Sequence, residues 1–188
     1  MQDAKHTPLY DNHVKLGGKM VEFGGWALPV QYSTILEEHK AVRENCGIFD
    51  VSHMGEVTVS GKDALAFLNN LLTNDFTGME TGRCRYSPMC YDNGGTVDDL
   101  IIYKRGEDDY LIIVNASNTD KDFAWMQAHA TGDVQLQNIS ASVAQLALQG
   151  PKYREVLAKA TVEGVLPEKF YTFTGHVLVG CIDCLVST

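Results

Sequence analysis

The stretch that decides the fold is Cys84–Asn115, CRYSPMCYDNGGTVDDLIIYKRGEDDYLIIVN. Three of its segments are rich in the apolar, β-branched and aromatic residues that favour strands. Asp92-Asn93-Gly94-Gly95 is a strong turn signal between the first two segments, and a short polar connection at 105–109 separates the last two. The stretch therefore predicts a three-stranded antiparallel meander. The three strands are expected at residues 84–90, 97–104 and 110–115.

Four helices are expected around this meander. Thr34 and Glu37 form a capping box before the first, Gly47 is a natural stop for it, and Pro151 suits the first turn of the last. Because helices are inserted between groups of strands and do not alternate strictly with them, we expect an α+β fold of antiparallel sheets with flanking helices. The helices are expected at 35–45, 62–72, 120–130 and 150–160, and further strands at 56–60, 134–138, 143–149 and within 175–188.

The composition limits the classes of function. The 188 residues include 15 Lys and Arg against 24 Asp and Glu, which gives a net charge of −9. A chain this acidic has no electrostatic footprint for nucleic acid or for an anionic membrane surface. No apolar run approaches a membrane span, no secretory signal is visible in MQDAKH, and the five cysteines are an odd, scattered set. We therefore expect a cytoplasmic protein with reduced thiols.

Two adjacent acids in the central strand are the first candidates for chemistry. Because successive side chains of a strand point to opposite faces, Asp98 and Asp99 cannot act as a close dyad. A single carboxylate buried among apolar neighbours has a raised pKa and can hold a proton from a weakly basic ligand nitrogen. On strand position alone, however, a turn-ending or backbone-capping role is favoured. Strict alternation would place Asp99 with Val97, Ile101 and Tyr103, and Asp98 with Leu100 and Ile102.

A second candidate is Asp50–Glu56, DVSHMGE, which leads into a strand. His53 belongs to the residue type that titrates near neutral pH, but no Ser or Cys nucleophile is placed to partner it. We therefore expect its ring to hold the loop through hydrogen bonds to backbone. Met54 and Gly55 would allow a flat ligand to pass close to the chain, the Met as an adaptable apolar surface.

Aromatic residues of the meander are a third candidate. Tyr86 and Tyr103, with Asn115 at the rim, could line a groove for a planar, hydrogen-bonding heterocycle, and ordinary core filling is the alternative. Cys181-x-x-Cys184 is not expected to hold a metal. Its spacing puts the two thiols on opposite faces of a strand, and two further ligands at matching spacing are not apparent.

Six short motifs, taken in order between Thr7 and Thr188, resemble the aminomethyltransferase, or T-protein, family of the glycine cleavage system. Each motif alone is weakly specific, and the ordered set is specific. The motifs are MVEFGGW at 20–26, FDVSHMGE at 49–56, LTND at 72–75, GGTVDDL at 94–100, VNASN at 114–118 and LQGP at 148–151.

The resemblance implies a tetrahydrofolate-dependent enzyme. Members of the family take an aminomethyl group from the lipoyl arm of a partner, the H-protein, release ammonia and form 5,10-methylenetetrahydrofolate. The family's key carboxylate corresponds to the second Asp of GGTVDDL, which is Asp99, and is implied to orient the folate and handle a proton. Met54, Tyr86, Tyr103 and Asn115 match the family's folate cavity. No metal is implied.

The resemblance also implies that part of the site is missing. Family members are longer, and after a segment like Leu185–Thr188 they continue into an Arg-Thr-Gly-Tyr-Thr-Gly-Glu stretch and a barrel-like C-terminal domain. We therefore expect a truncated chain with an incomplete folate pocket and doubtful activity on its own, whose exposed edges could pair two copies. Residues 1–50 and 138–188 would form an incomplete first domain, and 51–137 a central antiparallel-sheet domain with flanking helices.

Two other functions remain open. A non-enzymatic folate-binding or assembly module of the same fold would bind folate without consuming an aminomethyl group. A folate-dependent demethylase of the same superfamily would act on a methylated amine or sulfonium. The SHMGE and DDL segments favour the aminomethyltransferase.

Overall fold

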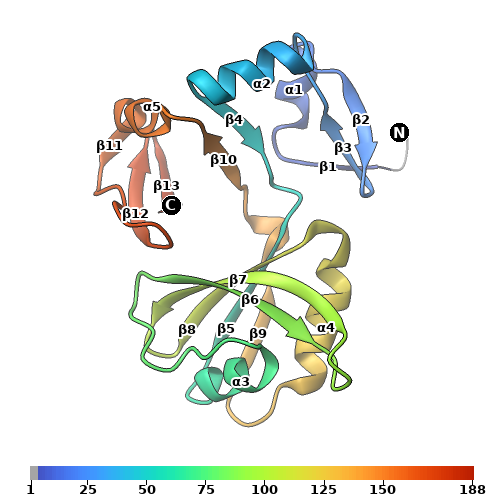
Figure 1. Ribbon diagram of the computed structural model, residues 1–188, viewed down its shortest axis with the longest axis vertical. Coiled ribbons are helices and arrows are strands. Elements are labelled where there is room, and N and C mark those ends of the chain that lie inside the picture. Colours follow the sequence, from blue (N-terminus) through green and yellow to red (C-terminus); the bar gives the residue numbers. More distant parts are fainter. Residues whose placement is uncertain (1–3) are drawn as a thin grey trace. The chain divides into compact units, whose positions relative to one another are not determined.

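A computed structural model describes residues 4–188 of the chain, which divide into two compact units (Figure 1). The chain passes from the first unit to the second after His53 and returns after Val143. We expected residues 164–177 and 183–188 in the first domain, whereas their contacts group them with the second unit. Of the described residues, unit 1 comprises 4–53, 144–163 and 178–182, and unit 2 comprises 54–143, 164–177 and 183–188.

Unit 1 contains small sheets and short helices. Its three-stranded sheet has the order β1-β3-β2, with β1 parallel and β2 antiparallel to β3, and β4 pairs with β10 in a separate antiparallel sheet. The predicted start of α2 is confirmed, because Thr34 Oγ1 accepts a hydrogen bond from the Glu37 amide at 3.2 Å. The elements are β1 (Lys5–His6), α1 (Tyr10–Lys15), β2 (Met20–Phe23), β3 (Trp26–Pro29), α2 (Ile35–Glu44), β4 (Gly47–Asp50), β10 (Leu146–Gln149), α5 (Tyr153–Ala160) and β11 (Thr161–Glu163).

Unit 2 is built on a five-stranded sheet of order β6-β7-β8-β5-β9, in which every neighbouring pair is antiparallel. The predicted meander is confirmed as β6, β7 and β8, joined at the expected turns. The elements are β5 (Gly55–Ser60), α3 (Ala64–Leu71), β6 (Cys84–Cys90), β7 (Thr96–Gly106), β8 (Asp109–Val114), the 3₁₀ turn η1 (Ala116–Asn118), α4 (Thr119–His129), β9 (Gln135–Asn138) and the 3₁₀ turn η2 (Ser140–Ser142).

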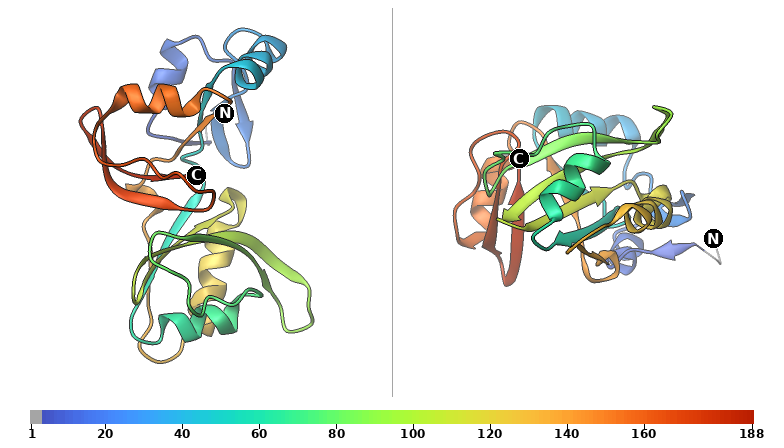
Figure 2. Two further views of the ribbon diagram at one scale, coloured as in Figure 1. Left: turned by 60° about the vertical axis from the view of Figure 1, so that its left-hand side comes forward. Right: turned by 90° about the horizontal axis from the view of Figure 1, so that it is seen from below.

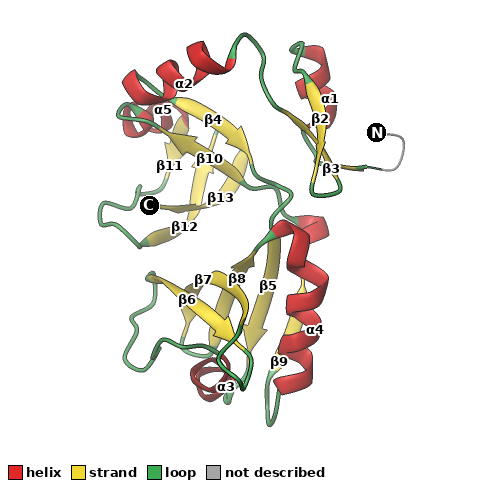
Figure 3. Ribbon diagram, turned by 45° about the vertical axis from the view of Figure 1, so that its right-hand side comes forward, coloured by secondary structure: helices red, strands yellow, loops and turns green. Residues whose placement is uncertain are grey.

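Helices α3 and α4 both cover the same face of this sheet, as Figures 2 and 3 show. Alternate strand residues point into the core between sheet and helices, where they are fully or nearly fully buried. The opposite face, called the open face below, carries the side chains between them. The core includes Val57 and Val59 of β5, Leu68 of α3, Leu100 and Ile102 of β7, Ile112 and Val114 of β8, and Met126 of α4.

The end of the chain, where strand was expected within 175–188, forms a hairpin of β12 (Phe173–Val179) and β13 (Ile182–Ser187), in a sheet of order β11-β12-β13. Backbone hydrogen bonds explain why residues 164–177 group with unit 2. The Phe173 amide donates to the Gly82 carbonyl at 2.8 Å, and the Cys84 amide donates to the Tyr171 carbonyl at 2.9 Å. These bonds connect the start of β6 to a segment more than eighty residues later in the chain. Local sequence patterns do not predict such a long-range pairing.

Candidate functional site

The central strand β7 buries one acid and exposes the other. Asp98 is 7% exposed, whereas Asp99 lies on the open face and is exposed. Strict alternation misplaced Val97, because the register of β7 against β6 shifts there and turns Val97 into the core with Leu100 and Ile102. The expectation of an apolar, buried setting for Asp99 is therefore wrong, and it is Asp98 that is buried. That the two carboxylates leave the strand on opposite faces is confirmed.

The structure places all five predicted site residues in unit 2. Tyr86 lies opposite Ile101 in the pairing of β6 with β7, which puts it on the open face with Asp99. Asn115 follows the last residue of β8, and Met54 precedes the first residue of β5; those two strand ends pair with each other. Segments far apart in sequence therefore bring Tyr86, Asp99 and Asn115 together.

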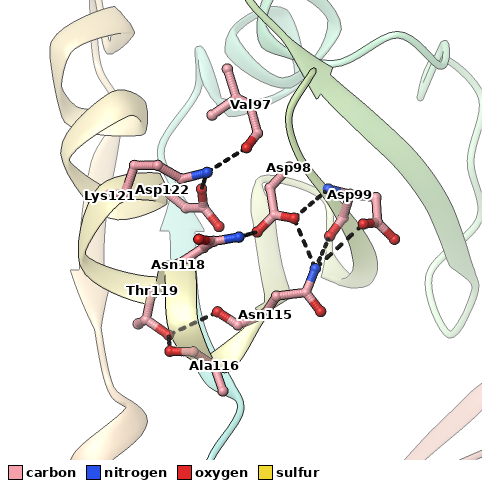
Figure 4. Close-up of polar contacts among 9 residues, drawn as sticks. All are labelled: Val97, Asp98, Asp99, Asn115, Ala116, Asn118, Thr119, Lys121 and Asp122. Atoms are coloured by element: carbon pink, nitrogen blue, oxygen red, sulfur yellow. Dashed lines mark hydrogen bonds and ion pairs between the residues drawn. The ribbon is translucent and has the colours of Figure 1, made fainter. Parts of the chain in front are cut away.

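Asn115 links the two acids of β7 (Figure 4). Its Nδ2 donates to Asp98 Oδ1 at 2.9 Å and to the backbone carbonyl of Asp99 at 3.0 Å, and lies 3.4 Å from Asp99 Oδ1. The amide nitrogen is thus surrounded by acceptors, which sets the orientation of the amide. Its carbonyl oxygen, Oδ1, points away from both carboxylates in Figure 4.

Tyr86 completes a group that we call the Asp99 cluster: Tyr86, Asp99 and Asn115. Its ring is 42% exposed, and its hydroxyl is in hydrogen-bonding reach of the Asp99 carboxylate. Burial, followed by the charge of Asp99 and this hydrogen bond, raises the pKa of Tyr86 above its usual value. The cluster presents an exposed carboxylate flanked by a phenol and an amide, an arrangement that can bind a flat ligand bearing N–H donors.

The other two predicted residues are placed differently. Tyr103 is only 8% exposed, its ring lies 5.4 Å from that of Phe173, and its hydroxyl lies 3.2 Å from Ser187 Oγ. It is thus packed under the terminal hairpin, and burial raises its pKa. Met54 is half-buried, and no hydrogen bond or ring contact among the described residues ties it to the Asp99 cluster.

The loop before β5 corrects one expectation, that for His53. A Cβ at Gly55 would lie 2.5 Å from Thr119 Oγ1 and 2.6 Å from Val114 Cγ2, so this glycine lets the start of α4 approach β5 closely. His53 does not hold the loop through Nδ1, which is buried without a hydrogen-bond partner among the described residues. Its ring instead meets that of Phe23 edge-on at 6.4 Å, and burial lowers the pKa of His53.

Two polar residues beside Asp98 were not predicted from the sequence. Asn118 Nδ2 donates to Asp98 Oδ2 at 3.0 Å, and the carboxyl of Asp122, which is 0% exposed, makes a hydrogen bond with Asp98. An Asp in the first turn of a helix ordinarily faces solvent and complements the helix dipole. The sequence between Asn115 and Asp122 therefore gives no indication that the Asp122 side chain is buried.

Glu56 is a third residue that the sequence did not single out as functional. It lies opposite Ile113 in the pairing of β5 with β8, is 1% exposed, and neither of its carboxyl oxygens has a hydrogen-bond partner among the described residues. Burial raises its pKa to about 7. The open face therefore also carries a carboxyl that is readily protonated near neutral pH.

Neither a metal-binding group nor a membrane-spanning helix is found among the described residues. No group of three or more His, Cys, Asp and Glu side chains within 4–188 is placed to hold a metal ion. No helix in that range is long and apolar enough to cross a membrane.

Known proteins resemble the chain along its whole length. The chain is 55% identical over 187 residues to the aminomethyltransferase of Bacillus mycoides (strain KBAB4), and 54% identical over 187 residues to that of Bacillus cereus (strain G9842). Each match covers 100% of this chain and 51% of the relative. The chain therefore spans about half the length of the curated relatives it matches.

Solved structures agree with these matches. The glycine cleavage system aminomethyltransferase T from Bartonella henselae superposes with a TM-score of 0.80 at 36% identity, covering 90% of this chain and 46% of that one. Heterotetrameric sarcosine oxidase from Corynebacterium sp. U-96 superposes with a TM-score of 0.55 at 15% identity, which shows a shared fold only. The family model of the GCVT N-terminal domain matches residues 9–188. On this match and the aminomethyltransferase relatives, the chain belongs to the GCVT N-terminal domain family.

Proposed function

We propose that this chain is the folate-facing part of a tetrahydrofolate-dependent aminomethyltransferase of glycine cleavage. Its donor is the aminomethyl group on the lipoyl arm of the H-protein, its acceptor is tetrahydrofolate, and its site of action is the cytoplasm. The observation that carries the proposal is the Asp99 cluster, because in a chain of this family it sets an exposed carboxylate on an open sheet face with Tyr86 and Asn115 beside it.

The residues present suit a reduced pterin. A pterin is flat and bears N–H donors along one edge, and Asp99 offers a carboxylate to such donors. Ile101 and Ile113, half-buried on the same face, supply an apolar floor for the ring. We assign binding and orientation to Tyr86 and Asn115, with Met54 and Tyr103 as further members of the cavity.

The reaction must balance two protons. The methylene carbon loses its bonds to the amino nitrogen and the lipoyl sulfur, and gains bonds to N5 and N10 of tetrahydrofolate. The two protons that leave N5 and N10 end on ammonia and on the lipoyl thiol. We assign to Asp99 the acceptance of a hydrogen bond from a folate nitrogen and the handling of its proton as the carbon–nitrogen bond forms.

The test uses this chain joined to the part of the Bacillus mycoides aminomethyltransferase that it does not cover, called the joined protein below. Methylene transfer from aminomethyl-lipoyl H-protein to tetrahydrofolate is measured together with ammonia release. Asp99→Asn, which keeps the shape but removes the charge, should lower kcat at least about a hundredfold. Asp108→Asn, at an exposed turn between β7 and β8, is the matched control and should be unchanged.

The outcomes separate the remaining functions. Full activity of the Asp99→Asn variant would remove Asp99 from the mechanism. Tetrahydrofolate binding by the joined protein without ammonia release would instead indicate a folate-binding module. Transfer to tetrahydrofolate of a one-carbon unit at the oxidation level of formaldehyde, taken from a methylated amine and without reaction of the H-protein, would indicate a demethylase.

A further inference from the structure

Helix α4 directs a buried acid at the acid of β7. Asp122 is 0% exposed, and its carboxyl makes a hydrogen bond with the carboxyl of Asp98. Ionised carboxylates are acceptors only, so two of them can form a hydrogen bond only when one carries a proton. The pair therefore holds one proton in a place that solvent does not reach.

The surroundings of the two acids decide which one carries it. Asp98 accepts hydrogen bonds from Asn115 Nδ2 at 2.9 Å, from Asn118 Nδ2 at 3.0 Å and from the Asp99 amide at 2.9 Å. These donors stabilise a negative charge on Asp98. Although burial by itself would raise the pKa of Asp98, the hydrogen bonds from Asp122 and these neighbours hold it below its usual value.

Asp122 has no comparable set of donors. No N–H or O–H group of the described residues outside the Asp98–Asp122 pair donates a hydrogen bond to either of its oxygens, and Lys121 Nζ lies 3.4 Å from Oδ1. That ammonium also donates to the backbone carbonyl of Val97 (Figure 4). Burial and the charge of Asp98 raise the pKa of Asp122 to about 7, so the proton resides on Asp122.

The charge on Asp98 in turn sets the direction of the Asn115 amide. A neutral Asp98 could turn its hydroxyl toward Asn115 and accept either end of the amide, whereas a charged Asp98 accepts only from Nδ2. With Nδ2 turned inward, Oδ1 of Asn115 faces away from the two carboxylates, as Figure 4 shows. Asn115 and Asp99 then offer two acceptors from adjacent strands.

We propose that Asp122 is a positioning residue: its proton, donated to Asp98, fixes Asn115 so that its carbonyl oxygen joins Asp99 as a paired acceptor for the ligand. The pairing matches a heterocycle edge that carries adjacent N–H donors. That this heterocycle is a reduced pterin rests on the proposed function, whereas the proton link between the acids does not.

A pH dependence follows. Loss of the Asp122 proton would leave two buried carboxylates facing each other, with Asp99 of β7 and Lys121 of α4 as the other charged groups around them. Their repulsion would loosen Asp98 and release Asn115. Ligand affinity should therefore fall as the pH rises from about 6 to about 8.5.

The first experiment needs no ligand and uses the 188-residue chain labelled with carbon-13 at the Asp carboxyls and nitrogen-15 at the Asn side chains. In the unmodified chain, one Asp carboxyl should titrate near neutral pH, and the Asn115 side-chain amide signals should shift with the same midpoint. Asp122→Asn, whose amide can still donate to Asp98, should remove the titration and keep the Asn115 signals in place. Asp120→Asn, an exposed position in the same helical turn, is the control and should keep both.

The second experiment measures tetrahydrofolate binding by the joined protein. Asp122→Ala should raise the Kd at least about tenfold, because the hydrogen bond that Asp122 donates to Asp98 is lost. Asp122→Asn should bind within about threefold of the unmodified protein near pH 6, and should bind more tightly than it above about pH 8. Rescue by Asn but not by Ala, together with the flattened pH profile, distinguishes a donor role from simple core filling.

The results that overturn the proposal are specific. It is wrong if no Asp carboxyl of the unmodified chain titrates near neutral pH, or if Asp122→Asn displaces the Asn115 signals. Both measurements use the unmodified chain and Asp122→Asn, so they can be made even if Asp122→Ala does not fold. If the unmodified joined protein does not bind tetrahydrofolate, the proposed function fails, and the carboxyl and amide signals still decide the role of Asp122.

Discussion

At the scale of single residues, Glu56 and Asp122 each make the stability of the fold depend on pH. Both are buried acids of unit 2 whose pKa values are raised to about 7. Between about pH 4 and about pH 7 the folded chain keeps protons that the unfolded chain has lost. The free energy of unfolding therefore falls as the pH rises through this window, by up to about 1.4 kcal/mol per pH unit for each group.

A glutamine at position 56 should remove the Glu56 share of this dependence. At pH 8, where the buried carboxyl would have to ionise, Glu56→Gln should be more stable than the unmodified chain by on the order of 2 kcal/mol. Near pH 4 the two should be equally stable. Urea unfolding at a series of pH values measures the difference, with Glu107→Gln at an exposed turn as the control. An unchanged pH slope would show that Glu56 is ionised in the folded protein.

At the scale of elements, a buried hydrogen bond joins helix α1 to strand β4 within unit 1. His13 Nε2 lies 2.8 Å from Asp50 Oδ2, and His13 Nδ1 lies 2.6 Å from the Tyr32 hydroxyl. The Asp50 side chain is 1% exposed. Although burial would raise the pKa of Asp50, hydrogen bonds from His13, Ser52 and Thr7 hold it below its usual value. A short helix thus depends on a polar contact to a residue 37 positions away.

Loss of His13 should therefore unfold unit 1 first. His13→Ala leaves the Asp50 charge buried and unpaired, which should destabilise this unit by about 3 kcal/mol. Tyr32→Phe, which removes one partly exposed hydrogen bond, should cost about 1 kcal/mol. The chain carries one tryptophan in each unit, Trp26 on β3 and Trp125 on α4. In a Trp125→Phe variant the fluorescence reports the unfolding of unit 1, and in a Trp26→Phe variant it reports the unfolding of unit 2.

The predicted result is selective. In the Trp125→Phe background, His13→Ala should move the urea midpoint reported by Trp26, and in the Trp26→Phe background it should move the midpoint reported by Trp125 less. Equal shifts of the midpoint at both probes would mean that the two units unfold as one cooperative body. The prediction that the contact of His13 with Asp50 stabilises unit 1 selectively would then be wrong.

At the scale of the whole molecule, the two-stranded sheet of β4 and β10 leaves each strand with an unpaired edge among the described residues. Ile48 and Phe49 of β4 and Leu146 of β10 are all substantially exposed there. Exposed apolar edges are templates for pairing with another chain. We therefore propose that a second copy of this chain can pair along this sheet.

Sedimentation velocity should show association that grows with protein concentration. Ile48→Lys, which places a charge on the edge strand, should shift the chain toward monomer. Leu36→Lys, at an exposed position on α2 away from the edge, makes the same change in charge and polarity and should leave association unchanged. A chain that stays monomeric at every concentration tested would contradict edge pairing.

Much of the fold follows from local sequence signals. The meander β6–β8, the four longer helices and the final hairpin were predictable because each rests on alternation, helical spacing or turn residues within one short window. Helix α1 and strands β1 to β4 were not predicted, because elements of two to six residues are too short for a periodic pattern. Their stability comes from contacts such as His13 with Asp50 and not from propensity.

The candidate site divides in the same way. The meander and the family resemblance identified Asp99, Tyr86 and Asn115 from the sequence. The structure joins these three, whereas it packs Tyr103 beneath Phe173 and Ser187. A register shift at Val97 turns that residue into the core, and α3 and α4 cover the strand face that carries Leu100 and Ile102; strict alternation anticipates neither the shift nor which face is covered.

The sequence by itself determined the α+β class, the strand that bears the acids and the family to which the chain belongs. Only the tertiary structure decided which acid is buried and which partner shares its proton. The physical reason is distance along the chain. Local propensity and alternation act between near neighbours, whereas the pairing of Asp98 with Asp122 exists only after β7 and α4 have packed on the same face of the sheet.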